Sequence, residues 1–233
     1  MKKNNLQNAI KDLDLVEKLR YIANTFDGKA VFTTSFGVED QVVTDLIFAN
    51  DINIDIVTLD TGRLFEETYK VFHSTIEKYK KTIRVYHPER KTVEKLLSDK
   101  GPLSFYESIE NRKECCNIRK VEPLRRALEN NECWVTGIRA DQSSGRTEME
   151  MIEYDEGYGL FKMNPIFDWS LDKVMNYLKE KNIPYNQLHH QGFISIGCAP
   201  CTRAVKPEED FRAGRWWWEN NSGKECGLHT HGK

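Results

Sequence analysis

The chain has 233 residues, with 34 Lys or Arg against 36 Asp or Glu and a formal net charge of -2. This length predicts one substantial domain, and the balanced charge excludes a general attraction to nucleic acid or to an anionic membrane. No apolar run approaches the roughly 20 residues that cross a bilayer. Residues 1–5 lack the apolar stretch of a signal peptide, so a cytosolic protein is expected.

Helices and strands alternate along the chain as far as residue 138. Apolar residues recur every three or four positions over residues 5–26, which predicts one amphipathic helix. Residues 29–36 then read as a buried strand, followed by a tight turn at Gly37 and a helix over 38–49. The alternation continues with strand 54–59, helix 64–79, strand 83–86, helix 92–98, helix 116–128 and strand 133–138. Such alternation predicts an α/β fold, a mostly parallel sheet with helices on both faces.

The pattern changes after Gly145. Short alternating stretches over 153–167, with Gly157 and Gly159 between them, predict a hairpin, and a helix over 171–181 follows. Glycines and prolines break every periodicity beyond that helix, so a loop-rich C-terminal segment is expected. We therefore expect a single domain over 1–233, divided into an N-terminal helix (1–27), an α/β core (28–181) and a cysteine-bearing segment with a mobile tail (182–233).

Three loops follow predicted strands at 34–37, 59–63 and 136–139. Ligands of open α/β sheets bind outside the carboxyl ends of the strands, so these loops are expected to converge on one crevice. The first loop combines hydroxyl groups, Gly37 and a helix N-terminus, a combination that binds anions. The alternative is that its hydroxyls are ordinary helix N-caps.

Four of the six cysteines form two close pairs, Cys115-Cys116 and Cys198-x-x-Cys201. Thiols stay reduced in the cytosol, so this spacing indicates metal binding or catalysis rather than disulfides. Four thiolates suit either a [4Fe-4S] cluster or zinc. The tandem pair favours the larger cluster, because adjacent cysteines bind one small tetrahedral ion under strain. A thioredoxin-like redox pair at Cys198 and Cys201 is weaker, since Pro207 follows soon after and the tandem would be unexplained.

The other two cysteines stand alone. Cys133 lies in an apolar predicted strand and is interpreted as a buried structural thiol. Cys226 lies near the C-terminus between Gly223 and Gly227, which let the backbone bend. We interpret Cys226 as a nucleophile, and the alternative is an inert small hydrophobic side chain.

Basic residues accompany the first cysteine pair. Lys120 follows Cys116 by four positions, one helical turn, so its ammonium can reach toward a negatively charged cluster. Arg119, Arg125 and Arg126 share the same predicted helix and are interpreted as a solvated basic face.

Other arginines stand in polar or aromatic loops. Arg139 ends a predicted strand, and Arg212 and Arg215 precede three consecutive tryptophans at 216–218. Arginine suits bidentate recognition of sulfate or phosphate. The three tryptophans cannot all be buried in regular structure, so at least one is expected to be available for stacking.

Together these motifs resemble the assimilatory adenylyl-sulfate (APS) reductases, within the broader APS/PAPS reductase family. The resemblance rests on Thr34-Ser35-Phe36-Gly37-Val38-Glu39-Asp40, Leu59-Asp60-Thr61-Gly62, Cys115-Cys116-x-x-Arg119-Lys120-x-x-Pro123-Leu124, Thr136-Gly137-x-Arg139-x-Asp141-Gln142-Ser143, Ser195-Ile196-Gly197-Cys198-x-Pro200-Cys201-Thr202 and Glu225-Cys226-Gly227-Leu228-His229. It implies an adenine nucleotide alpha-hydrolase-like fold and a [4Fe-4S] cluster on the four paired cysteines. It also implies that Cys226 is the catalytic nucleophile.

The resemblance also assigns substrate-binding residues by matching position. Thr34, Ser35 and Gly37 would form a modified P-loop around the phosphosulfate, and Leu59 would border the adenosine. The sulfate end would be surrounded by Lys120, Arg139, Arg212 and Arg215. Many relatives have a serine at the position of Phe36, so binding here is expected to rely more on backbone N–H groups.

The implied reaction consists of two displacements. The Cys226 thiolate attacks the sulfate sulfur, AMP leaves, and thioredoxin releases sulfite from the resulting S-sulfo-cysteine, in assimilation of sulfate toward cysteine. PAPS-reducing relatives generally lack the four cysteines, so APS is favoured, with PAPS as a second substrate or the main one in an alternative reading. The remaining alternatives are a zinc-clamped PP-loop-type enzyme that uses ATP and a nucleotide-sensing module. No nucleic-acid or membrane partner is expected, and assembly into a homo-oligomer is left open.

Overall fold

The computed structural model of the protein describes residues 3–142 and 149–219. Its chain divides into two compact units, which are described in turn. The first comprises Met1–Thr58, Lys70–Arg84 and Asn130–Asn186, and the second comprises Leu59–Tyr69, Val85–Glu129 and Gln187–Lys233. The organisation of 1–233 as a single domain with three segments stays a prediction.

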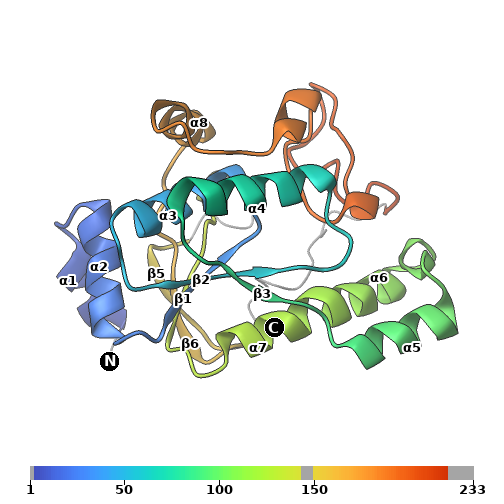
Figure 1. The fold of residues 1–233 in the computed structure, drawn as a ribbon, viewed down its shortest axis with the longest axis horizontal. Helices are drawn as coiled ribbons and strands as arrows, with labels where there is room; N and C mark the ends of the chain where they lie inside the picture. The colour runs from blue at the N-terminus through green and yellow to red at the C-terminus, as the bar shows by residue number, and fades with distance from the viewer. Residues whose placement is uncertain (1–2, 143–148, 220–233) are drawn as a thin grey trace. The chain divides into compact units, whose positions relative to one another are not determined.

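A six-stranded sheet is the centre of the first unit (Figure 1), with strand order β3-β2-β1-β4-β6-β5. Its strands are β1 (Ala30–Thr34), β2 (Asp55–Leu59), β3 (Arg84–Tyr86), β4 (Cys133–Val135), β5 (Ile152–Asp155) and β6 (Leu160–Met163). Strand β1 pairs in parallel with β2 and β4, and β4 pairs in parallel with β6. Only the β5–β6 hairpin is antiparallel among these pairs of the described chain. The predicted α/β fold and the predicted hairpin are both confirmed.

The central strands are buried on both faces, because consecutive residues of β1 and β4, whose side chains alternate, are nearly all inaccessible. Their register places the carboxyl ends of neighbouring strands at one edge, where Thr34 of β1 pairs with Thr58 of β2. The loops that leave β1 and β4 therefore start from the same edge of the sheet.

The helices of the first unit are α1 (Lys3–Ile10), α2 (Leu15–Thr25), α3 (Val38–Ala49), α8 (Leu171–Glu180) and most of α4 (Glu66–Tyr79), with a short 3-10 turn at Ala140–Gln142. The predicted single helix over 5–26 is wrong, because the chain breaks between α1 and α2. Asp14 starts α2 with a capping box, in which its side chain accepts from the Glu17 N–H and the Glu17 side chain accepts from the Asp14 N–H. Apolar periodicity continues across this break, which is why the pattern suggested one helix.

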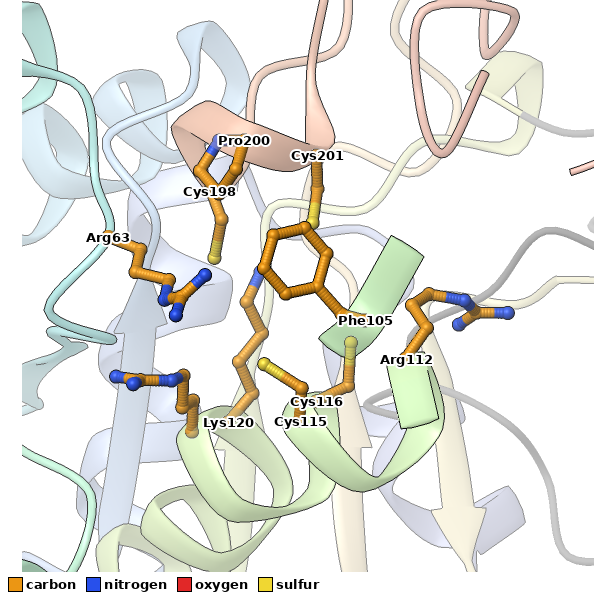
Figure 2. Close-up of a pocket in the computed structure, with 10 residues that line it drawn as sticks. Arg63, Phe105, Arg112, Cys115, Cys116, Lys120, Cys198, Pro200 and Cys201 are labelled. Carbon is orange, nitrogen blue, oxygen red and sulfur yellow. The ribbon is translucent and has the colours of Figure 1, made fainter. Parts of the chain in front are cut away.

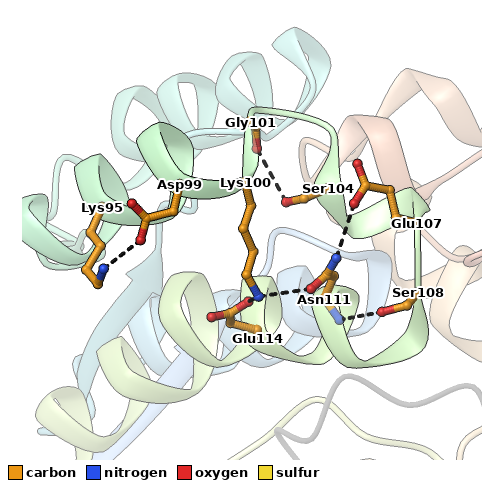
Figure 3. A network of polar contacts seen from close by, with 9 residues as sticks. All are labelled: Lys95, Asp99, Lys100, Gly101, Ser104, Glu107, Ser108, Asn111 and Glu114. Atoms are coloured by element: carbon orange, nitrogen blue, oxygen red, sulfur yellow. Dashed lines mark hydrogen bonds and ion pairs between the residues drawn. The ribbon is translucent and has the colours of Figure 1, made fainter.

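The second unit contains α5 (Arg90–Lys100), α6 (Ile109–Cys116) and α7 (Glu122–Leu128), joined with short 3-10 turns at Ser104–Tyr106, Gln187–Gln191 and Ala199–Cys201. Helices α5 and α6 lie side by side (Figure 3), and Lys100 of α5 bonds to Asn111 and Glu114 of α6. Residues 187–219 are mainly loop, as predicted. Across residues 3–142 and 149–219, the helices are too short or too polar to cross a membrane.

Candidate functional site

The four cysteines predicted as ligands line one cavity in the second unit (Figure 2). The cavity has about 310 Å³ of space free of protein atoms, part of it open to solvent. Cys115 and Cys116 end α6, whereas Cys198 and Cys201 bracket the short turn Ala199–Cys201. The described cysteines form no disulfide. Two pairs separated by more than eighty positions in the sequence therefore share one site with free thiols.

A π-helical segment, Asn117–Val121, joins α6 to α7 into a continuous helix. The N–H of Glu122 donates to the carbonyl of Asn117, five residues earlier, instead of four. Pro123 follows immediately, and proline inside a helix removes an N–H and crowds the preceding turn. We attribute the wider turn to this proline. The helix supplies Arg112, Cys115, Cys116, Arg119 and Lys120 to the cavity lining.

The start of this helix differs from the prediction. It begins at Ile109 instead of 116, because Ser108 caps it by accepting from the N–H of Asn111. Cys115 and Cys116 thus lie within helical structure, which fixes the directions of both side chains.

The thiols differ in how readily they ionise. Burial alone would raise the pKa of Cys198, but Lys120, a hydrogen bond with Thr61, and Arg215 lower it below the ordinary value. Burial, together with Cys198 and Cys116, raises the pKa of Cys201 to about 12. Metal ligation requires deprotonated thiols. A cationic centre bonded to these sulfurs would therefore stabilise the thiolate form, which burial disfavours at Cys115 and Cys201.

Four cations line the same cavity, namely Arg63, Arg112, Arg119 and Lys120. Arg63 donates to the Pro102 carbonyl at 2.6 Å, and its guanidinium lies 4.8 Å from the centre of the Phe105 ring. Arg119 is only 6% exposed and donates to the Thr61 carbonyl at 2.7 Å. The solvated interpretation is therefore wrong for Arg119. Arg119 lies four residues after Cys115, just as Lys120 lies four residues after Cys116. This spacing is the sequence signal that could have predicted Arg119 beside the cysteines.

Arg212 and Arg215 lie in the loop before the tryptophans. Their guanidinium carbons are 5.9 and 4.8 Å from the centre of the Trp216 ring. Arg215 is buried and packs against Gly197 so closely that a Cβ there would overlap its guanidinium. Trp216 is 1% exposed whereas Trp217 is 38% exposed. The expectation that the three tryptophans are not all buried is confirmed.

The loop after β1 belongs to the first unit. Thr34 is buried and its hydroxyl accepts from the N–H of Phe36, which adopts a left-handed φ of 60°. Ser35 donates its N–H and its hydroxyl to the Asp40 carboxylate, at 2.6 and 2.7 Å. Gly37, which has no side chain to cap a helix, occupies the N-cap of α3. The loop hydroxyls are therefore not ordinary N-caps, and that alternative is wrong.

The loop after β4 lies against the loop after β1. Arg139 is 2% exposed, and its Nε donates to Glu39 Oε1 at 3.0 Å. A Cβ on Gly137 would overlap the Asp40 carboxylate, so only glycine allows this close approach. These two loops converge as predicted, while the convergence of 59–63 with them stays a prediction because that loop belongs to the second unit.

The residues predicted to form the site are distributed over both units. Thr34, Ser35, Gly37 and Arg139 belong to the first unit, and Leu59, Lys120, Arg212, Arg215 and the four paired cysteines belong to the second. Leu59 is the last residue of β2 and is half-buried. Cys226 lies outside the described residues. Cys133 is fully buried, and burial raises the pKa of its thiol, which confirms a structural role.

The cavity offers an all-cysteine ligand set, because all four paired cysteines line it. Both a structural zinc and an iron-sulfur cluster accept four thiolate ligands. The ligand set by itself therefore fits either kind of centre.

The sheet, the loop after β1 and the four-cysteine cavity define a class of sulfur-metabolising proteins. Residues 29–204 match the phosphoadenosine phosphosulfate reductase domain, and the chain belongs to that family. It is 47% identical over 225 residues to the adenosine 5'-phosphosulfate reductase of Sinorhizobium fredii, covering 97% of this chain and 89% of that protein. The Neisseria meningitidis serogroup B protein of the same name is 50% identical over 201 residues, covering 86% and 82%.

Solved structures support the same fold. The phosphoadenylyl-sulfate (PAPS) reductase of Candida auris, in a phosphate complex, superposes with a TM-score of 0.73 and 28% identity, covering 87% of this chain and 96% of that one. The FMN adenylyltransferase of Candida glabrata, at 17% identity and a TM-score of 0.56, shares the fold, covering 98% of this chain and 76% of that one. The adenine nucleotide alpha-hydrolase-like fold is thus confirmed.

Proposed function

We propose that this protein reduces adenosine 5'-phosphosulfate (APS) to sulfite and AMP in the cytosol, with thioredoxin as reductant, in sulfate assimilation toward cysteine. The observation that carries the proposal is the single cavity lined by all four paired cysteines together with Arg63, Arg119 and Lys120. The curated relatives that share about half of its sequence are named adenosine 5'-phosphosulfate reductases, which supports APS as substrate.

Cys115, Cys116, Cys198 and Cys201 would hold a [4Fe-4S] cluster. When bound, the cluster supplies an electrostatic environment for the substrate, because the two thiols of the reductant provide both electrons that the reaction consumes. Lys120, one turn after Cys116, offsets the negative charge of four thiolates. The basic lining is thus an electrostatic complement to the ligand set.

The chain's own groups bind the substrate in this proposal. Backbone N–H groups of the loop after β1, with Ser35, take the phosphosulfate at the N-terminus of α3, where the helix dipole favours an anion. Leu59 borders the adenosine. The family resemblance assigns the sulfate end to Lys120, Arg139, Arg212 and Arg215.

Cys226 is the proposed nucleophile, a role that rests on the family resemblance. Its thiolate forms a bond to the sulfate sulfur while the bond from that sulfur to the bridging phosphate oxygen breaks, and AMP leaves with the electron pair. One thioredoxin thiolate then attacks the Cys226 sulfur and displaces sulfite. The second thioredoxin thiol releases Cys226 from the mixed disulfide. Two electrons from the dithiol thus convert sulfate sulfur to sulfite sulfur.

The test is single turnover without reductant. Enzyme mixed with APS should release about one AMP per chain and gain one SO₃ on the peptide that contains Cys226, because the second displacement lacks a thiol. Reduced thioredoxin should then discharge sulfite. Cys226→Ser should abolish the burst, since a hydroxyl is a much weaker nucleophile than a thiolate.

Cys133→Ser is the matched control, because Cys133 is a buried thiol outside the cavity, and its burst should persist. An adduct on Cys133 or on a paired cysteine would contradict the proposal, as would full turnover by Cys226→Ser. The same assay with PAPS decides between the two nucleotides. A larger burst rate with PAPS would reassign the main substrate.

A further inference from the structure

Asp40 occupies the hydrogen-bond donors of Ser35. Its Oδ2 accepts from the Ser35 N–H at 2.6 Å and from the Ser35 hydroxyl at 2.7 Å. These are two of the donors that an anion in this loop would use. A carboxylate of the protein itself therefore stands where the substrate's phosphosulfate is proposed to find its donors.

The side chain of Asp40 packs against the loop after β4. Its backbone N–H and Oδ1 lie against Gly137, where even a Cβ would overlap the carboxylate. Its backbone carbonyl accepts from the hydroxyl of Thr44 at 2.8 Å. Release of Ser35 by a swing of the carboxylate would be a movement that disturbs this packing.

A change of protonation releases Ser35 without such a movement. A hydroxyl has a single proton, and here Ser35 donates that proton to Asp40. If Asp40 is protonated, its own O–H can donate to the Ser35 oxygen, and the Ser35 proton becomes available to an anion. Two negative charges facing each other across Ser35 would repel, which favours the protonated form when the anion binds.

The charges around this carboxyl group act in the same direction. Burial, and then Glu39 on the same helix, raise the pKa of Asp40 to about 6, despite the opposing effect of the Ser35 hydrogen bonds. From the loop after β4, Arg139 is paired with Glu39 and lies 3.7 Å from Asp141. The guanidinium of Arg139 is thus engaged by other carboxylates.

We propose that Asp40 is a positioning residue that takes up one proton when the anionic substrate binds, so that the Ser35 hydroxyl turns from Asp40 to the phosphosulfate. The proton comes from solvent and returns when the product leaves. This inference rests on the proposed function, because it takes APS as the anion.

The experiment measures APS binding by calorimetry in the Cys226→Ser background, in which the ligand is not consumed. Titrations between pH 6 and 8.5, in pairs of buffers with different ionisation enthalpies, give the number of protons taken up. We expect uptake to approach one proton above pH 7. The Kd should rise with pH by up to about tenfold per unit, the limit for linkage to a single proton.

Asp40→Asn should abolish both effects, because an amide side chain takes up no proton in this pH range. Asp51→Asn is the matched control, since Asp51 is an exposed carboxylate at the far end of α3 that pairs with Lys81. It should retain the proton uptake of the background protein.

If APS binds the Cys226→Ser protein without proton uptake, this inference is overturned but the proposed function is not. That result does not depend on whether Asp40→Asn folds. Uptake that persists in Asp40→Asn would also overturn it, because another group would then bind the proton. Failure of APS to bind at every pH would overturn the proposed function and this inference together.

Discussion

Arg112 and Glu219 form a buried ion pair in the second unit, with distances of 2.5 Å from Nε to Oε1 and 3.1 Å from Nη2 to Oε2. Their side chains are 1% and 3% exposed. The guanidinium also lies 4.6 Å from the centre of the Trp216 ring. The pair therefore joins α6, which carries Cys115 and Cys116, to the segment that follows Cys201.

Removal of one partner should be costly. Glu219→Gln removes the carboxylate that pairs with the buried Arg112 guanidinium, and we expect the free energy of unfolding to fall by about 3–5 kcal/mol. Glu209→Gln is the control, because Glu209 makes an equally bidentate pair with Arg203, and the side chains of Arg203 and Glu209 are 35% and 28% exposed. Its loss should cost about 1 kcal/mol or less in anaerobic urea unfolding. Equal effects would contradict the assignment of Arg112–Glu219 as a buried support.

The four cysteines of the cavity should each be necessary for iron. Anaerobically purified protein should contain about four irons per chain and absorb broadly near ~400 nm. Single replacement of Cys115, Cys116, Cys198 or Cys201 by serine should remove the iron and the activity. Cys133→Ser should keep the iron, because that thiol is buried in β4. Stoichiometric zinc in an active preparation would refute the cluster assignment.

Arg212 and Arg215 should affect substrate and not the cluster. Replacement of either by alanine removes a charged donor from the proposed sulfate site, which we expect to cost roughly 1.5–3 kcal/mol in kcat/KM for APS. The absorbance of the cluster should be unchanged. Arg203→Ala, which removes an arginine already paired with Glu209, serves as the control. Unchanged kinetics in both variants would exclude these arginines from the site.

Gly137 should be intolerant of a side chain. In Gly137→Ala the new methyl group overlaps the Asp40 carboxylate, so the loop after β1 must shift. We expect a loss of about 1–3 kcal/mol in unfolding free energy and weaker APS binding. Gly157→Ala, in the β5–β6 turn, is the comparison, because its new Cβ would lie 3.3 Å from the Asp155 carboxylate. APS affinity unaffected by Gly137→Ala would disprove the close coupling of the two loops.

Local sequence patterns determined most of the secondary structure. Helix α3 spans the predicted residues 38–49, because its start at a glycine turn and its apolar content are properties of one continuous segment. The alternation of strands and helices predicted the mostly parallel sheet for the same reason. The break at Asp14 was not predicted, because the spacing of apolar residues indicates only which face of a helix is buried. That spacing continues through the capping box that separates α1 from α2.

The sequence motifs also identified the paired cysteines and the family. These motifs are short, and two pairs of closely spaced cysteines indicate a metal-binding role without knowledge of the tertiary structure. What they could not determine is which side chains meet these thiols. Arg63 and Thr61 reach the cavity from a loop that precedes Cys115 by more than fifty positions.

Only the tertiary structure decided how Ser35 and Arg119 are used. The sequence shows which groups can donate hydrogen bonds but not which groups accept them. In the folded protein the Ser35 hydroxyl donates to Asp40, and the Arg119 guanidinium donates to the Thr61 carbonyl. The physical reason is that periodicity records burial along one element, whereas hydrogen-bond partners depend on the packing of elements distant in the chain. Burial and neighbouring charges also set the pKa of Asp40 and of Cys198, because the cost of a charge depends on everything that surrounds it.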